Sequence, residues 1–255
     1  MNKRDLIALY NKELRKEIQI QGFIREQTEH VVRYISQFEE KSYILFSNVT
    51  KENSRDIIKR ELAYFHELKK DFEWKVYSFD KPSNLKEMLK QEGFTIDERE
   101  TLMVLKLEEH HPLLSNAQLH NVKEIVDKEG IQQIIELENA VWNESFADLG
   151  VRLWRDKQSE PGHLFLYGIY DKDQLVSAAW MYLEKNTSFA SLWGGSTLPK
   201  YRGKGYYTNL LAARARKAYE KGPPFLTVEA SEMSRPILEK YGFQCLGYSY
   251  GCQSP

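Results

Sequence analysis

Hydrophobic positions along the first half of the chain alternate between helical spacing and the short apolar runs typical of strands. The helical spacing predicts helices at the N-terminus, over 55–68 and over 85–91. Runs rich in aromatic and β-branched residues predict strands over 31–36, 43–46, 74–79 and 101–107. Gly93 follows the third helix, at the position where glycine often ends helices. This mixture of elements predicts an α/β fold with a mixed sheet.

The second half of the chain follows the same order of elements. Its pattern predicts helices over 130–142, 149–157, 206–220 and 235–241, and strands over 119–123, 164–170, 175–183, 189–193, 226–229 and from Phe243. Each half runs strand, strand, helix, strand, helix and then Gly-Phe and a strand, and segment 85–94 echoes segment 237–243. A shared order of this kind indicates duplication.

A proline-containing stretch with two adjacent histidines separates the halves, and the periodicity restarts after it. We therefore predict two related domains, residues 1–110 and 118–255, joined by a linker over 111–117. The N-terminal domain is predicted to be the truncated copy.

Composition excludes several classes of function. The net charge of −1 argues against a broad surface for nucleic acid, and no apolar run approaches the length that spans a bilayer. The N-terminus lacks the apolar core of a signal peptide, and only Cys245 and Cys252 are available for a disulfide. The histidines do not cluster at metal-ligand spacings. We expect a cytoplasmic protein with no metal and no nucleic-acid or membrane partner.

The segment after the strand that begins at Phe189 carries the clearest chemistry. It has two glycines and two cations, and a helix begins directly behind it. Glycine lets the backbone approach a ligand closely, and the N–H groups and dipole of a helix N-terminus favour an anion. The sequence therefore predicts a phosphate cradle made of Arg202, Gly203, Lys204, Gly205, Tyr206, Tyr207 and Thr208.

Other interpretations of this loop fit less well. A nucleotide P-loop needs G-x-x-x-x-G-K followed by Ser or Thr, and the chain contains no such string. The dinucleotide fingerprint G-x-G-x-x-G begins at Gly203 but has Thr208 at its third glycine. A plain turn with solvated cations is the remaining alternative.

The loop matches a third pattern, in which Arg or Gln is followed three residues later by Gly and five residues later by Gly or Ala. Arg202 and Gly205 match, whereas Tyr207 occupies the last position. Together with Pro199, the leucines at 210–211 and the later Leu-Glu-Lys-Tyr-Gly-Phe at 238–243, residues 119–247 resemble the GCN5-related N-acetyltransferase (GNAT) family. The resemblance implies that the loop binds the pyrophosphate of acetyl-CoA and that the acetyl group passes directly to an amine. The corresponding stretch 47–54 of the first half has no glycine, as expected of a degenerate copy.

Paired glycines interrupt the strand just before this loop, in Trp-Gly-Gly-Ser-Thr at 193–197. Such a pair marks a bulge or a backbone that another group approaches. The resemblance implies that this strand splays from its neighbour and pairs with the pantetheine arm. Gly195, Ser196 and Thr197 would then offer backbone groups, one of them to the thioester carbonyl. A bulge that only bends the sheet is the alternative.

The acid and base are harder to assign. Many relatives carry a tyrosine, the acid for the thiolate, five residues before the Phe of Gly-Phe, but Leu238 stands there. The candidate catalytic residues are Glu229, at a strand end, and two tyrosines, Tyr241 and Tyr248. A salt-bridged Glu229 and a packed Tyr241 are the structural alternatives.

The acceptor is predicted only by class, as an amine on a small molecule or a peptide. Four aromatic residues of the second half belong to its core or wall an acceptor pocket: Trp142, Phe146, Trp154 and Trp180. We expect a monomer or a homodimer. Two alternative functions stay open, a non-catalytic acyl-CoA-binding or sensor protein and a nucleotide-binding interaction module.

Overall fold

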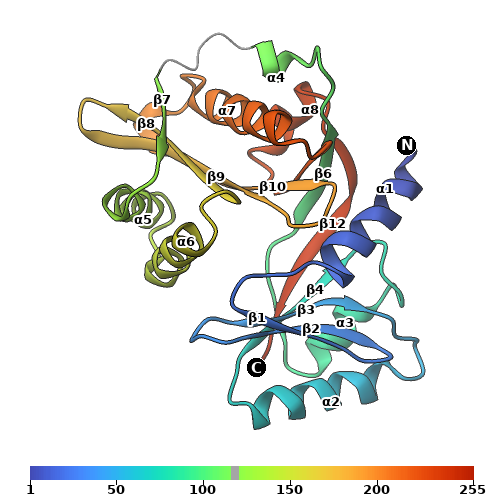
Figure 1. The fold of residues 1–255 in the computed structure, drawn as a ribbon. Helices are drawn as coiled ribbons and strands as arrows, with labels where there is room; N and C mark the ends of the chain where they lie inside the picture. Colours follow the sequence, from blue (N-terminus) through green and yellow to red (C-terminus); the bar gives the residue numbers. More distant parts are fainter. Residues whose placement is uncertain (116–120) are drawn as a thin grey trace. The chain divides into compact units, whose positions relative to one another are not determined.

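The computed structural model describes residues 1–115 and 121–255, and its contacts divide them into two compact units (Figure 1). Unit 1 contains residues 1–103, 229–235 and 245–255, and unit 2 contains residues 104–228 and 236–244. The predicted linker 111–117 contains a short helix, α4 (Pro112–Ser115), whose Leu113 is fully buried. Residues 116–117 of that linker and the start of the strand predicted over 119–123 lie outside the described residues.

Unit 1 contains most of the elements predicted for the first half. Its helical elements are α1 (Lys3–Tyr10), a π-helical turn η1 (Asn11–Lys16), α2 (Ser54–Glu67) and α3 (Leu85–Gln91). Its strands are β1 (Phe23–Gln27), β2 (Val31–Ser36), β3 (Ser42–Ser47), β4 (Phe72–Tyr77), β5 (Thr95–Ile96) and β12 (Gln244–Gln253), and β6 (Glu100–Lys106) begins here. The predicted helices and strands are confirmed; β1 and β5 were not predicted.

The sheet of unit 1 runs in the order β1-β2-β3-β4-β12, with β5 paired to β12. Strands β3 and β4 are parallel and the other neighbours are antiparallel. The sequence assigns β12 to the C-terminal domain, 118–255, but it pairs with β4 from Ser249↔Tyr77 to Gln253↔Glu73. The contact units therefore do not coincide with the predicted domain boundary, because a long-range strand pairing places the C-terminus in unit 1.

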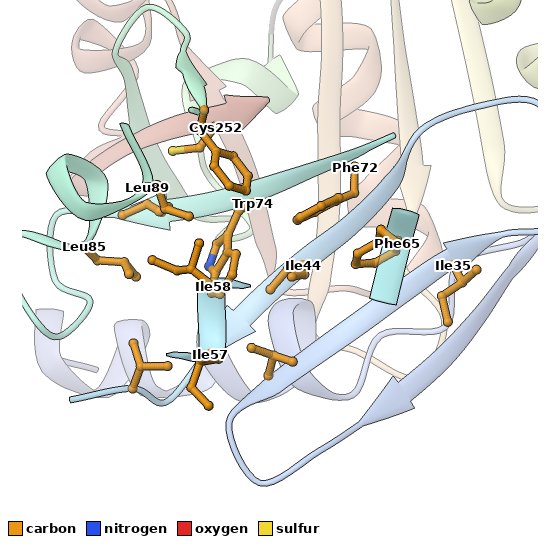
Figure 2. Close-up of a cluster of buried hydrophobic side chains, with 14 residues drawn as sticks. Ile35, Ile44, Ile57, Ile58, Phe65, Phe72, Trp74, Leu85, Leu89 and Cys252 are labelled. Atoms are coloured by element: carbon orange, nitrogen blue, oxygen red, sulfur yellow. The ribbon is translucent and has the colours of Figure 1, made fainter. Parts of the chain in front are cut away.

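Helices α2 and α3 cover one face of this sheet with apolar side chains (Figure 2). Phe65 of α2 stacks on Phe72 of β4 with ring centroids 4.2 Å apart, and Trp74 is fully buried beside them. The remaining labelled members of the cluster are Ile35, Ile44, Ile57, Ile58, Leu85, Leu89 and Cys252. The core therefore joins residues that lie far apart in the sequence, including the last strand.

Unit 2 contains the predicted site. Its strands are β7 (Val122–Ile125), β8 (Leu164–Asp171), β9 (Gln174–Leu183), β10 (Phe189–Thr197) and β11 (Phe225–Ala230), whose last two residues belong to unit 1. Its helices are α4, α5 (Lys128–Trp142), α6 (Ala147–Ser159), a 3-10 turn η2 (Pro199–Tyr201), α7 (Tyr206–Lys221) and α8 (Arg235–Lys240), of which Arg235 is in unit 1. These elements confirm those predicted within the described residues.

Strands β7 to β10 are antiparallel to one another and β11 is parallel to β10, which gives the mixed α/β sheet that the sequence predicts. Helices α5 and α6 lie on one face of this sheet and α7 on the other (Figure 1). The apolar face of α7 is buried, including Leu210, Leu211, Ala215 and Ala218. The N-terminus of α7 is therefore fixed against the sheet. No helix of the described residues is long and apolar enough to cross a membrane.

Candidate functional site

The glycine pair forms a bulge in β10. Strand β10 pairs with β9 along its length, and the register shifts between Gly194 and Ser196. Both Gly194 (φ +67°) and Gly195 (φ +102°) lie in the left-handed region that favours glycine. A Cβ at Gly194 would lie 2.4 Å from the ring of Trp180, and one at Gly195 would lie 2.7 Å from the ring of Tyr207. The two glycines are therefore required both by the backbone and by aromatic rings on opposite faces of the sheet.

On its other side, β10 leaves its partner early. It pairs with β11 only at Phe189, Ala190 and Ser191 among the described residues, although β10 continues to Thr197. Beyond Ser191 the edge of β10 that faces away from β9 thus has no strand on it within unit 2. Trp193 and Gly194 are exposed there. An extended ligand with amide groups can pair with such an edge.

The loop after β10 ends at the N-terminus of α7. Gly203 (φ +77°) and Gly205 (φ +80°) are left-handed, and Gly205 is the N-cap residue, with no side chain capping the helix. The first α-helical hydrogen bond is donated by the N–H of Asn209 to Gly205, so the N–H groups of the first turn have no partner within the helix. Within residues 1–115 and 121–255, no atom lies within 4 Å of a Cβ built on either glycine. Both glycines are exposed, so the space around them is open to solvent.

Two cations border this space. Arg202 and Lys204 are exposed, and the Arg202 Nε donates a hydrogen bond to the Thr197 carbonyl at 3.2 Å. The Lys204 Nζ lies 4.7 Å from the centre of the Tyr201 ring, and the Tyr201 hydroxyl bonds to Asp171 at 2.6 Å. The structure thus brings the predicted cradle residues, 202–208, together with Gly195, Ser196 and Thr197 in one unit. An uncapped helix end with adjacent cations suits a phosphate group.

A buried arginine is hydrogen-bonded to the backbone next to the bulge. The Nη1 of Arg214, in α7, donates to the carbonyl oxygens of Trp180 at 3.3 Å and Trp193 at 3.1 Å. Arg214 is 2% exposed, and burial lowers the pKa of its guanidinium to about 10. Because both carbonyls adjoin the bulge, Arg214 holds the backbone there in one orientation. No sequence motif marks this residue, which lies in the middle of a helix rich in small and basic residues.

A second buried charge lies on the opposite face, where α5 meets β10. The Glu138 Oε2 accepts hydrogen bonds from the Ser196 Oγ at 2.8 Å and from the Trp142 Nε1 at 3.0 Å. Trp142 Nε1 also lies 3.1 Å from the Ser196 Oγ. Burial raises the pKa of the Glu138 carboxyl, although both hydrogen bonds lower it. One sequence feature indicates that Glu138 is buried, namely its position in the apolar stripe of α5.

The candidate base Glu229 belongs to unit 1 and is already engaged. Its carboxylate lies 2.5 Å from the Lys75 Nζ and accepts a hydrogen bond from the Tyr77 hydroxyl at 2.7 Å. Burial alone would raise the pKa of Glu229, but Lys75 holds it below its usual value. Tyr10 extends the cluster, with its hydroxyl 3.0 Å from that of Tyr77. Glu229 is salt-bridged, as the structural alternative supposes, and its catalytic role stays a prediction.

Glu100 borders the same cluster, 3.5 Å from the Lys75 Nζ. Burial and the neighbouring Glu229 raise its pKa from 4.5 to about 7. A carboxyl whose pKa is higher in the folded than in the unfolded protein stabilises the fold at low pH, and that stability is lost as the pH rises through 4.5 to about 7.

We therefore expect Glu100→Gln to flatten the stability profile between pH 5 and 8, because the amide mimics the protonated carboxyl at every pH. Thermal denaturation across this range measures the effect, with Glu98→Gln, at an exposed neighbour, as the control. Parallel curves for wild type and Glu100→Gln would show that Glu100 does not titrate in this window.

The two candidate tyrosines lie in different units. Tyr248, in unit 1, has the Arg99 guanidinium 4.5 Å from its ring centre. Tyr241, in unit 2, follows α8, and its carbonyl oxygen lies 3.0 Å from the His111 Nε2. Leu238 is fully buried, so the position of the usual acid is filled by core. The catalytic roles of both tyrosines stay predictions.

The chain is similar in sequence and fold to known acetyltransferases. Residues 122–246 match the family described as an acetyltransferase (GNAT) domain, and no curated protein matched the chain. A GCN5-related N-acetyltransferase from Kribbella flavida is 13% identical, with a TM-score of 0.69 over 98% of this chain and 95% of its own. A conserved protein of unknown function from Staphylococcus epidermidis is 12% identical, with a TM-score of 0.66 over 96% of each chain.

A tandem GNAT protein from the clavulanic acid biosynthesis pathway has a TM-score of 0.60 at 12% identity, over 93% of this chain and 84% of its own. At these identities the likeness is one of fold. This likeness fits a tandem arrangement of the fold, and the degeneracy of the first copy stays a prediction.

Proposed function

We propose that this chain, whose residues 122–246 form a domain of the GNAT acetyltransferase family, transfers the acetyl group of acetyl-CoA directly to an amine. One observation carries the proposal: an edge of β10 that is left without a strand leads directly to the uncapped N-terminus of α7. An extended arm that ends in a pyrophosphate fits this combination of amide edge and anion cradle.

In this proposal, different residues bind different parts of acetyl-CoA. Backbone N–H groups of 203–208, with Arg202 and Lys204, hold the pyrophosphate. The backbone of Gly195, Ser196 and Thr197 pairs with the pantetheine arm and polarises the thioester carbonyl. The left-handed backbone of Gly203 and Gly205, which turns the chain into the helix, supports this assignment.

The reaction needs one nucleophile and one proton donor. The uncharged amine attacks the carbonyl carbon, the new C–N bond replaces the C–S bond, and the departing thiolate takes up a proton as the amine loses one. Glu229, Tyr241 and Tyr248 remain the proposed acid and base. The proposed acceptor is an amine of a small molecule or a peptide, on a monomer or a homodimer.

One observation favours a second function, that of a non-catalytic acyl-CoA sensor. Leu238 is fully buried where relatives carry the acid, and a protein without that acid can serve as an acyl-CoA-binding sensor. Such a sensor would use the same cradle without turnover.

A two-step assay tests the proposal. Acetyl-CoA at about 100 times its Kd should stabilise the protein by about 2.7 kcal/mol, because it binds only the folded state. A panel of primary amines should then release free CoA thiol. Stabilisation without thiol release for any amine would favour the sensor, and stabilisation by ATP or NAD but not by acetyl-CoA would favour the nucleotide-binding module.

A further inference from the structure

Glu138 is a buried carboxylate that forms no ion pair with the residues that the structure describes. It is 4% exposed, and its two hydrogen-bond donors, the Ser196 hydroxyl and the Trp142 indole, are both neutral and both bind Oε2. The Oε1 atom is buried and has no hydrogen-bond partner among the described residues. An unpaired buried carboxylate is unfavourable unless it takes up a proton or a cation. A cationic group bound near Glu138 would therefore be stabilised by its charge.

The position of Glu138 connects it with the proposed thioester site. Its partner Ser196 follows Gly195 directly in the bulge of β10, the segment assigned to the thioester carbonyl. Through its 2.8 Å hydrogen bond to the Ser196 hydroxyl, the carboxylate is in direct contact with a side chain of that strand. All of these residues lie in unit 2.

Trp142 supplies the third feature. Its indole N–H bonds to both Glu138 and Ser196, yet 48% of the residue is exposed. The aromatic Phe146 and Trp154 also pack at this helical face. A carboxylate beside exposed aromatic surface matches a ligand with a cationic head and an apolar body.

We infer that Glu138, Ser196 and Trp142 form the acceptor subsite, and that this subsite selects primary amines that are cationic in solution and carry an aromatic or other apolar substituent. The inference rests on the proposed function. In this subsite the charge of the Glu138 carboxylate attracts the ammonium group, and Trp142, which is 48% exposed, lies against the substituent.

We assign the same carboxylate, that of Glu138, as the proton acceptor. The ammonium gives one proton to Glu138, which leaves the uncharged amine to form the C–N bond as the C–S bond breaks. The second amine proton leaves with the CoA thiolate, and Glu138 returns its proton to solvent. Burial raises the pKa of the Glu138 carboxyl, which makes it a better proton acceptor than an exposed carboxylate.

Binding of phenethylammonium chloride, measured by calorimetry with and without CoA, tests the subsite without requiring turnover. Glu138→Gln keeps the shape but removes the charge, and should weaken binding by about tenfold or more, the usual worth of a hydrogen bond to a charged group. Glu136→Gln, at an exposed position on the same helix, is the matched control and should bind as wild type does. Trp142→Ala should weaken phenethylammonium more than methylammonium.

Stability provides a second readout. Removing a buried charge should raise the melting temperature of Glu138→Gln relative to wild type. The difference should grow as the pH rises, because burial raises the pKa of the wild-type carboxyl and its ionisation then costs stability. Equal phenethylammonium binding by wild type and Glu138→Gln, or no binding by wild type, overturns the inference. If the wild-type protein does not bind acetyl-CoA, the proposed function itself is contradicted.

Discussion

Replacing Gly205 by valine is expected to abolish acetyl-CoA binding in the concentration range where wild type saturates. A β-branched residue at φ +80° is strained by about 1–2 kcal/mol, and it would add a side chain at the N-cap of α7, where the pyrophosphate is proposed to bind. Calorimetric titration with acetyl-CoA measures the loss of affinity, and thiol release measures the loss of turnover.

Gly222 at the other end of α7 provides the matched control. It is also left-handed, at φ +102°, and also has no atom within 4 Å of a built Cβ. Gly222→Val therefore imposes similar backbone strain on the same helix without touching the cradle. Equal affinities for Gly205→Val and Gly222→Val would show that the loop does not hold the ligand.

Replacing Lys75 by methionine is expected to destabilise unit 1 by about 3 kcal/mol, the usual result of removing one partner of a buried ion pair. Lys75 is 14% exposed and lies within 4 Å of three carboxylates, those of Glu229, Glu100 and Glu73. Without the ammonium these carboxylates repel one another. Urea denaturation followed by tryptophan fluorescence measures the effect, since Trp74 is fully buried in this unit.

Two further variants separate the ion pair from general effects of the substitution. Lys106→Met breaks an exposed pair with Glu108 and should change stability by less than about 1 kcal/mol. Adding Glu229→Gln to Lys75→Met should recover part of the loss, because one unpaired carboxylate is removed. A Lys75→Met protein as stable as Lys106→Met would mean that the cluster contributes no net stability.

Much of the fold could be predicted because its elements are encoded locally. The apolar stripe of α7 and the glycines at 203 and 205 are neighbours in the sequence, so the loop and the helix behind it are visible together. The same holds for the bulge, which the glycines at 194–195 mark. The residues expected to bind phosphate therefore come together in the structure.

Long-range contacts could not be predicted in this way. The pairing of β12 with β4 and the ion pair between Lys75 and Glu229 join residues more than 150 positions apart, and no local pattern encodes them. Glu138 is an intermediate case, since it occupies the apolar stripe of α5 with Ile131, Ile134 and Ile135. Its place in that stripe indicates burial, but only the fold shows that Ser196 lies beside it.

The most direct test of the account is to incubate wild-type protein with acetyl-CoA and a primary alkylamine, and to quantify free CoA and acetylated amine in the same sample. Direct transfer predicts that the two products form in equal amounts and that both require the protein. Release of CoA without acetylated amine, or formation of neither across the amine panel, would contradict acetyl transfer by this chain.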